Sequence, residues 1–339
     1  MNSLLARREE PHAAPGRGRH RDPHQDVPKL TTTVPREYVH RASLAEVFLA
    51  GCESINETRF ALTGQWPRAH TFFNSPEGTQ HDPLQAAETI RQVGLYLAHA
   101  RFGVPLGHPC IMWDMSWETD PEQLTIGSTP TELLLNAVCS TQPRQHTTPS
   151  RGRFELTVDI WRNHRIAATG MAHFTCITPT AYQRLRQQPH PTTTSAETDP
   201  TGAAVGAPDR PTPAPAARVG RTRSLDVVLA PTDQPDQWLL APDPHHAIMF
   251  DHAGDHIPGM VLLEAARQAA CTRLPPHITF QPTRVTSQFH HYVETTTPCR
   301  IQATPLATDD PTTPAFEITA TQNGATAFSA EIHGRTQPR

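Results

Sequence analysis

The chain contains Leu263-Glu264-Ala265-Ala266-Arg267-Gln268 and, 176 residues earlier, Ala87-Glu88-Thr89-Ile90-Arg91-Gln92. In both runs a glutamate, an arginine and a glutamine keep the same spacing inside an apolar, alanine-rich segment that predicts a helix. Farther along, Phe154-Glu155-Leu156-Thr157 is echoed by Phe316-Glu317-Ile318-Thr319 after a shorter interval. This pattern indicates one domain written twice, with a loop shortened in the second copy.

The glutamate in each predicted helix lacks a polar face that would keep it in water. The neighbours of Glu264 are apolar on every side, and Glu88 has similar surroundings. Burying an ionised carboxylate is costly, so a helix that needed only stability would carry an apolar residue there. The alternative is an ordinary surface pair of Glu264 with Arg267 at i,i+3. The recurrence in both copies favours a functional site.

Composition excludes several classes of protein. The 339 residues suffice for two domains, and the net charge of -4 with no basic stripe argues against nucleic-acid binding. Lys29 is the only lysine, which argues against Schiff-base chemistry and P-loop phosphate binding. The six cysteines are scattered without the spacing of a zinc site. Without a signal peptide or an apolar run of about 20 residues, we expect a soluble cytoplasmic protein that makes no membrane contact.

Two biased segments divide the chain. Residues 1–35 predict a disordered leader, and the Pro/Thr/Ala-rich residues 187–223 predict a linker. The two domains are then 36–186 and 224–339. Each contains a strand-like segment at its start (46–49 and 225–229), a long helix (83–102 and 259–273) and several alternating strands. This order predicts an α+β fold in which an antiparallel sheet packs on a helix.

The loop before the second helix contains two histidines. His252 and His256 are four residues apart, but Gly254 and Pro258 oppose a helix there and no third ligand is evident, so we predict no metal site. One of the two histidines could act in acid–base chemistry or hydrogen bonding beside Glu264. The alternative is a solvent-exposed loop histidine. A further pair also repeats, because His70 and His246 each precede their helix glutamate by 18 residues.

The run from Pro258 to Gln268 resembles the central-helix signature of hotdog-fold acyl-carrier-protein dehydratases, in which a loop histidine, here His252, and a helix acid face a thioester. Over both repeats the chain is similar to the A-factor synthase family, which makes γ-butyrolactone autoregulators in actinomycetes. This resemblance implies two tandem hotdog domains that form a pseudodimer, each an antiparallel sheet wrapped around a long central helix. It is carried by Val39–Ser43, Gln65–His70, Asp82–Gln92, Leu97–Ala100, Phe102–Pro105, Met112–Asp114 and Phe250–Ala270.

The resemblance implies an acyltransferase that moves a β-ketoacyl group from an acyl carrier protein to a hydroxyl of dihydroxyacetone phosphate, after which the ester closes to a butenolide. The carrier protein supplies the phosphopantetheine arm, so no cofactor of the chain's own is expected, and a homo-oligomer is allowed. A general base whose pKa is raised by burial is expected at Glu264 or Glu88, with His252 as a further catalytic residue.

The remaining site residues are expected to bind the substrates. Their roles are phosphate binding by Arg267 and Arg91, orientation by Gln268 and Gln92, and polarisation of the thioester carbonyl by the amides of Gly259 and Met260.

Two other functions are compatible with the sequence. The first is a hotdog thioesterase or dehydratase acting on acyl-carrier substrates, although neither reaction explains an arginine placed to bind a phosphate. The second is a non-catalytic regulator that binds the lactone, for which Glu264→Ala should leave binding intact.

Overall fold

The strands form one antiparallel sheet that continues through both halves of the chain. The computed structural model describes residues 32–142, 152–187, 211–252, 254–310 and 312–338. We call residues 32–187 the first half and residues 211–338 the second half. The strands of the first half are β1 (Leu49–Ser54), β2 (Arg59–Trp66), β3 (Cys110–Thr119), β4 (Thr131–Gln142), β5 (Arg153–Arg162) and β6 (Arg165–Cys176). Those of the second half are β7 (Leu229–Pro231), β8 (Gln237–Leu240), β9 (Ile278–Phe289), β10 (Cys299–Leu306), β11 (Ala315–Gln322) and β12 (Ala325–Pro338).

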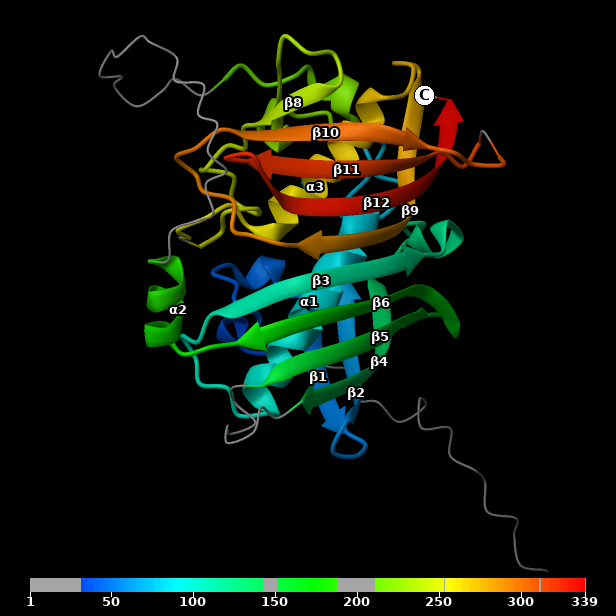
Figure 1. The fold of residues 1–339 in the computed structure, drawn as a ribbon. Coiled ribbons are helices and arrows are strands. Elements are labelled where there is room, and N and C mark those ends of the chain that lie inside the picture. Colours follow the sequence, from blue (N-terminus) through cyan, green and yellow to red (C-terminus); the bar gives the residue numbers. More distant parts are fainter. Residues whose placement is uncertain (1–31, 143–151, 188–210, 253, 311, 339) are drawn as a thin grey trace, which may run out of the picture.

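The strand order is a near-palindrome, β1-β2-β4-β5-β6-β3-β9-β12-β11-β10-β8-β7. The halves meet at β3 and β9, which are neighbours in the middle of the sheet (Figure 1). Met115 pairs with Ser287 and Trp117 with Val285, and the Ser287 hydroxyl donates to the Met115 carbonyl at 2.8 Å. This arrangement confirms the α+β prediction of two hotdog units that pair as a pseudodimer.

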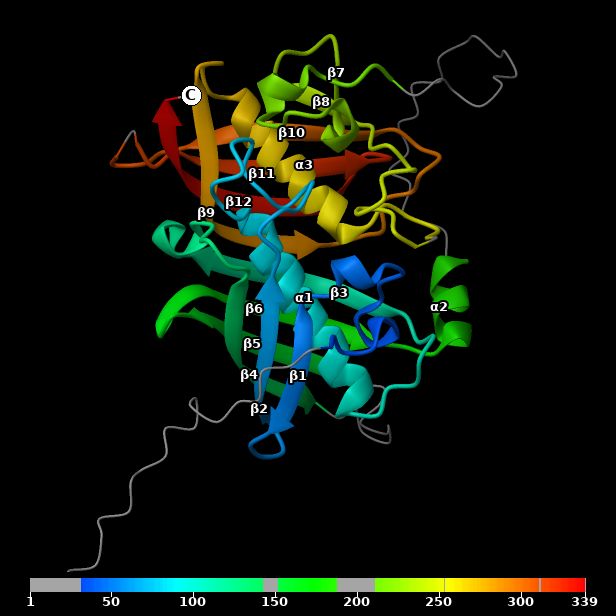
Figure 2. The same cartoon turned by 180° about the vertical axis from the view of Figure 1, so that it is seen from behind.

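Two long helices lie on the same face of the sheet, α1 (Pro83–Ala100) and α3 (Gly259–Thr272), as Figure 2 shows from behind. Both begin where the sequence predicts and end one or two residues earlier. The Asp82 carboxylate caps α1 by accepting the amide of Leu84 at 2.9 Å, and proline occupies the first helical position. Within the described ranges, no helix is both long and apolar enough to cross a membrane.

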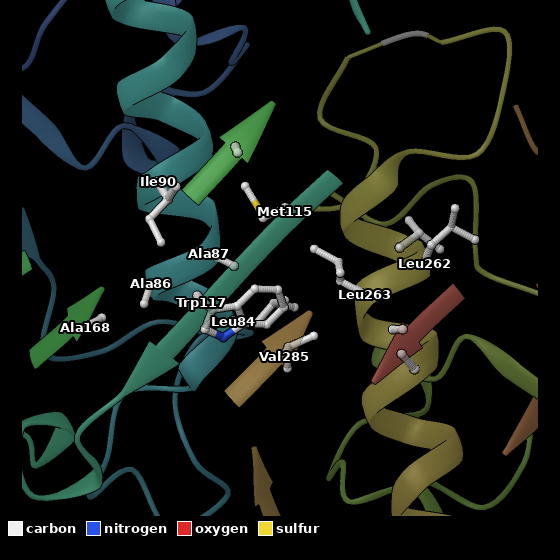
Figure 3. Close-up of a cluster of buried hydrophobic side chains, with 14 of the residues drawn as sticks. Leu84, Ala86, Ala87, Ile90, Met115, Trp117, Ala168, Leu262, Leu263 and Val285 are labelled. Atoms are coloured by element: carbon white, nitrogen blue, oxygen red, sulfur yellow. The ribbon is translucent and has the colours of Figure 1, made fainter. Parts of the chain in front are cut away.

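The core fills the space between these helices and the sheet. Figure 3 shows Met115, Trp117 and Val285 lying between α1 and α3, with Leu263 on the α3 side. The approach of α1 to β6 is very close, because a Cβ atom on Gly170 would lie 2.3 Å from Cδ1 of Ile90. Glycine at this position is therefore a packing requirement rather than a source of flexibility.

Residues 211–223 differ from the predicted linker. They include a 3₁₀ helix (Ala216–Val219), Val219 is fully buried, and Arg221 is ion-paired with Glu264. This segment belongs with the second half, because a proline-rich composition does not prevent a short 3₁₀ turn from packing on α3. Most of the leader (residues 1–31) and residues 188–210 of the linker lie outside the described residues.

The predicted initial strands also begin later than expected. In the first half, a 3₁₀ helix (Leu44–Glu46) precedes β1, and in the second half another (Ser224–Asp226) precedes β7. The remaining helical segments are Arg36–Val39, Pro121–Leu124 and α2 (Pro179–Arg186).

Candidate functional site

Glu88 lies fully buried at the centre of a cluster of charged and amide side chains. Arg91 Nε donates to Oε2 at 2.8 Å and Arg91 Nη2 to Oε1 at 2.8 Å. Arg41 Nε donates to Oε1 at 3.0 Å, and Gln92 Nε2 donates to the same oxygen at 2.7 Å. Gln92 also accepts the amide of Phe48 at 2.9 Å. The predicted trio of Glu88, Arg91 and Gln92 is thus brought together, with Arg41 as an additional member.

The second half builds the same cluster around the fully buried Glu264. Arg267 donates through Nη2 to Oε1 at 2.6 Å and through Nε to Oε2 at 2.9 Å. Arg221 donates to both carboxylate oxygens, at 2.8 and 2.7 Å. Gln268 Nε2 donates to Oε1 at 2.5 Å, and its oxygen accepts the amide of Val228 at 3.0 Å. Each helix glutamate is therefore held by two arginines and one glutamine.

The extra arginines join the halves to each other. Arg41 Nη1 donates to the carbonyl of Ile248 in the second half at 2.8 Å. Arg221 Nη1 donates to the carbonyl of Phe72 in the first half at 2.8 Å. Sequence analysis missed both residues because each lies at a separation of 180, not 176, from its counterpart. The signal that could have found them is the recurrence of Val39-His40-Arg41 as Val219-Gly220-Arg221.

The ionisation of the two glutamates differs from the expectation that burial raises the pKa. Burial alone would raise the pKa of Glu88, but the charges and hydrogen bonds of Arg41 and Arg91 lower it to about 2. Burial, Arg221 and Arg267 have the same opposing effects on Glu264, whose pKa is also about 2. Both carboxylates are consequently ionised at neutral pH, and their lone pairs are occupied by hydrogen bonds. They are better suited to positioning arginines than to removing a proton.

A cavity of about 790 Å³ lies where α1 of the first half faces the loop before α3 of the second half. Of the predicted site residues, Arg91, His252, Gly259 and Met260 line it. Glu88, Gln92, Glu264, Arg267 and Gln268 do not, although Arg91 and Arg41 bring the Glu88 cluster to its wall. Much of the wall is apolar and includes Ile90, Leu95, Met112, Met115, Leu156, Phe174, Met249, Leu262, Leu263 and Phe289.

The amino ends of the two helices are not equivalent. At α1 the Asp82 carboxylate caps the first turn and also lies 3.2 Å from Arg221. At α3 the N-cap is Pro258, with no side-chain cap, and Gly259 and Met260 line the cavity. The exposed amides and helix dipole at α3 can therefore polarise a carbonyl oxygen in the cavity. This asymmetry selects one cleft, which combines α1 with the amino end of α3.

The predicted loop histidine, His252, is connected to the Glu88 cluster. The Asp251 carboxylate lies 2.7 Å from His252 Nδ1 and 3.3 Å from Arg41 Nη1. Burial acts to raise the pKa of Asp251, but the hydrogen bond from His252 and the charge of Arg41 lower it. Because an ionised carboxylate only accepts, Nδ1 carries the proton and Nε2 of His252 keeps a lone pair. Asp251 was not predicted, and its contacts depend on the fold rather than on local sequence.

His256 occupies a similar but more exposed position. Its Nδ1 lies 2.7 Å from the Asp255 carboxylate, which is also hydrogen-bonded to Tyr182 and Arg186 of α2. His256 lines the cavity as well. The histidines that repeat 18 residues before each glutamate have a different role. His70 lies 3.3 Å from Glu46 and His246 lies 3.0 Å from Asp226, and both accept backbone amides of their own loops.

Comparison with known proteins gives consistent matches along the chain. The family model described as "AfsA: A-factor biosynthesis hotdog domain" matches residues 23–178 and 202–338. A 2-oxo-3-(phosphooxy)propyl 3-oxoalkanoate synthase of Streptomyces virginiae is 44% identical, over 90% of this chain and 99% of the relative. Synthases of the same name from Streptomyces griseus and Streptomyces coelicolor are each 35% identical, over 88% and 91% of this chain and 94% and 93% of the relatives.

Among solved structures, a putative oleoyl thioesterase of Lactobacillus plantarum is similar with a TM-score of 0.49 and 8% identity, over 84% of this chain and 99% of that chain. This similarity is too distant to bear on the choice of reaction.

Proposed function

The chain belongs to the A-factor biosynthesis hotdog domain family, and we propose that it is an acyltransferase that forms a 2-oxo-3-(phosphooxy)propyl 3-oxoalkanoate, the product for which its relatives are named. That product is the ester of a 3-oxo acid with dihydroxyacetone phosphate. The substrates are then dihydroxyacetone phosphate and a 3-oxoacyl thioester, delivered on the phosphopantetheine arm of an acyl carrier protein. The observation that carries this proposal is the single cavity in which an apolar wall meets Arg91, His252 and the open end of α3.

The two ends of the cavity suit the two substrates. The apolar residues of α1, β6 and α3 can bury the hydrocarbon part of the acyl group, whose removal from water favours binding by about 0.8 kcal/mol per methylene. Arg91 makes its hydrogen bonds with described residues through Nε and Nη2, and its side chain is 17% exposed. Its Nη1 is available for a phosphate oxygen.

His252 is the proposed general base. Its Nε2 takes the proton of the dihydroxyacetone phosphate hydroxyl, whose oxygen attacks the thioester carbonyl. The carbonyl oxygen develops negative charge, which the amides of Gly259 and Met260 stabilise. The C–O bond then forms, the C–S bond breaks, and the departing sulfur receives the proton from the imidazolium.

Glu88 acts at a distance from the reacting atoms. It holds Arg41, Arg41 holds Asp251, and Asp251 orients His252, so Glu88 is a positioning residue. In the second half, Glu264, Arg267 and Gln268 make the equivalent contacts away from the cavity. There they fix α3, whose amino end lines the site.

The test is to incubate the purified chain with a 3-oxoacyl carrier-protein thioester and dihydroxyacetone phosphate, and to follow products by mass spectrometry. We expect the phosphorylated ester and its butenolide in the native chain, and a loss of roughly 10²–10⁴-fold in kcat for His252→Gln. His245→Gln is the matched control, because His245 is an exposed histidine of the same loop that does not line the cavity.

Three results would contradict parts of this proposal. Free 3-oxo acid as the main product would indicate a thioesterase, and no turnover of either substrate would indicate a binding protein. A loss of ester formation in His256→Gln but not in His252→Gln would move the base to the other histidine.

A further inference from the structure

Three side chains that bind transition metals converge beside the cavity. His40 follows the first 3₁₀ helix, His99 lies in the last turn of α1, and Cys110 begins β3. Their ring nitrogens and sulfur all lie within 4.8 Å of one another, and the two Nε2 atoms are 2.8 Å apart. His40 and Cys110 line the cavity, whereas His99 is buried behind them.

The neighbours of this cluster hold it in a form that can coordinate a metal. His99 Nδ1 lies 2.8 Å from the carbonyl oxygen of Val104, so Nδ1 carries the proton and Nε2 keeps its lone pair. A backbone carbonyl in this role is typical of metal-binding histidines. Cys176 Sγ lies 2.7 Å from Cys110 Sγ. The hydrogen bond with Cys110, together with burial, raises the pKa of Cys176, so Cys176 remains a thiol that can donate to a Cys110 thiolate.

The backbone at His40 indicates that a histidine is retained there for a reason other than folding. His40 adopts φ 52° and ψ 51°, the left-handed region that favours glycine. At the equivalent place in the second half stands Gly220, with φ 71° and ψ 26°. Strained conformations of this kind persist mainly where function requires the side chain. The half that contributes His40 is also the half whose helix lines the cavity.

The charges around the cluster allow a cation. Burial, followed by the charge of Arg91, lowers the pKa of His40 to about 3, so its imidazole is neutral as metal binding requires. The guanidinium of Arg91 is paired with Glu88, which offsets its charge. A Cys110 thiolate would supply one negative charge to the site.

We propose that His40, His99 and Cys110 bind a metal ion of the zinc class, with a fourth coordination position open to the cavity. Zinc binds imidazole nitrogen at about 2.0–2.1 Å and thiolate sulfur at about 2.3 Å in a tetrahedral arrangement. The cluster needs only small side-chain shifts to reach these distances, and the cavity gives a ligand oxygen access to the fourth position. This site does not depend on the proposed acyl transfer.

The proposal is tested on the untagged full chain, reduced and stripped with a chelator. Zn²⁺ and Co²⁺ are added separately, and the readouts are bound metal per chain, affinity in competition with a chromogenic chelator, and the optical spectrum of the Co²⁺ form. We expect one tightly bound equivalent, together with a sulfur-to-cobalt charge-transfer band that reports the thiolate.

Two variants assign the ligands. His40→Gly should preserve the fold, because Gly220 holds the same backbone conformation, and should weaken binding by more than the roughly 10–100-fold that loss of an outer-shell partner costs. Cys110→Ser should abolish the charge-transfer band. Cys52→Ser and His245→Gly are controls that should bind as the native chain does.

Three outcomes would overturn the site. They are no binding by the native chain, which would leave a simple hydrogen bond between the two histidines, undiminished binding in both ligand variants, and a Cys110–Cys176 disulfide that persists in the reduced protein.

Discussion

Arg41 and Arg221 cross the junction between the two halves in opposite directions. Each guanidinium is ion-paired with the buried glutamate of its own half and donates to a backbone carbonyl of the other half. Each also lies near a carboxylate of the other half, Asp251 for Arg41 and Asp82 for Arg221. The two halves therefore share their buried charges, and neither glutamate is fully neutralised by its own half alone.

We predict that Arg221→Met lowers the free energy of unfolding by about 3–5 kcal/mol, because it leaves Glu264 buried with one arginine fewer. Chemical denaturation monitored by fluorescence measures the change. Arg284→Met is the control, since Arg284 is exposed and pairs only with the exposed Glu118. Its effect should stay within about 1 kcal/mol. Equal effects of the two substitutions would show that the Arg221 crossing is not a major source of stability.

Acid should destabilise the protein through the same clusters. The pKa of Glu88 and of Glu264 is about 2 in the folded chain, against an ordinary value of 4.5. A lowered pKa means that the unfolded chain binds protons first, so this contribution to stability is complete above about pH 4.5 and is lost as pH falls toward 2. Thermal unfolding measured from pH 6 to pH 3 should show a falling Tm. A Tm that rose on acidification would contradict the ionised state of both glutamates.

The sequence was sufficient to predict the duplicated fold. The spacing of Glu88, Arg91 and Gln92 and its repetition at Glu264 located both central helices, because a charged trio inside an apolar run is conspicuous against helical periodicity. The uncapped start of α3 at Gly259 was also predictable from Pro258.

The composite site could not be read from the sequence, because its members come from distant segments. Asp251 and Arg41 are 210 residues apart and meet only across the junction of the halves. The pKa of Glu88 was predicted in the wrong direction, because burial was visible in the apolar pattern while the second arginine was not. The choice of cleft likewise depends on Asp82, which caps one helix while the other is left open.

We predict that Asp251→Asn lowers kcat by roughly 10²–10⁴-fold with little change in KM, because the amide no longer stabilises the protonated ring of His252 or fixes its tautomer. Steady-state kinetics with a 3-oxoacyl thioester and dihydroxyacetone phosphate measures the effect. Asp255→Asn changes the corresponding contact of His256, at the same 2.7 Å distance, and provides the matched comparison.

An Asp251→Asn variant with native kcat would exclude the proposed link from Glu88 through Arg41 to the histidine. Circular dichroism on both variants separates this result from misfolding, since Asp251 also accepts the amide of Ala42 at 3.0 Å.

The length of the acyl chain should be controlled at Gly94 of α1. This glycine lines the cavity, and a Cβ atom there would lie 3.1 Å from the Phe174 ring and 3.2 Å from Leu156. Both neighbours also line the cavity, so Gly94→Ala should push them into the space that holds the acyl chain. We expect kcat/KM to fall by at least about tenfold for long 3-oxoacyl substrates and much less for short ones, since one methylene in an apolar pocket is worth about 1–3 kcal/mol.

Gly127→Ala is the control for Gly94→Ala, because a Cβ atom at Gly127 would make only ordinary contact, 3.7 Å from Arg162 Nη2, and Gly127 does not line the cavity. The measurement is kcat/KM across a series of chain lengths, with Tm recorded for each variant. An equal loss at every length would indicate general damage to α1 rather than a shortened cavity. A native profile would show that the acyl chain does not pass between α1 and β6.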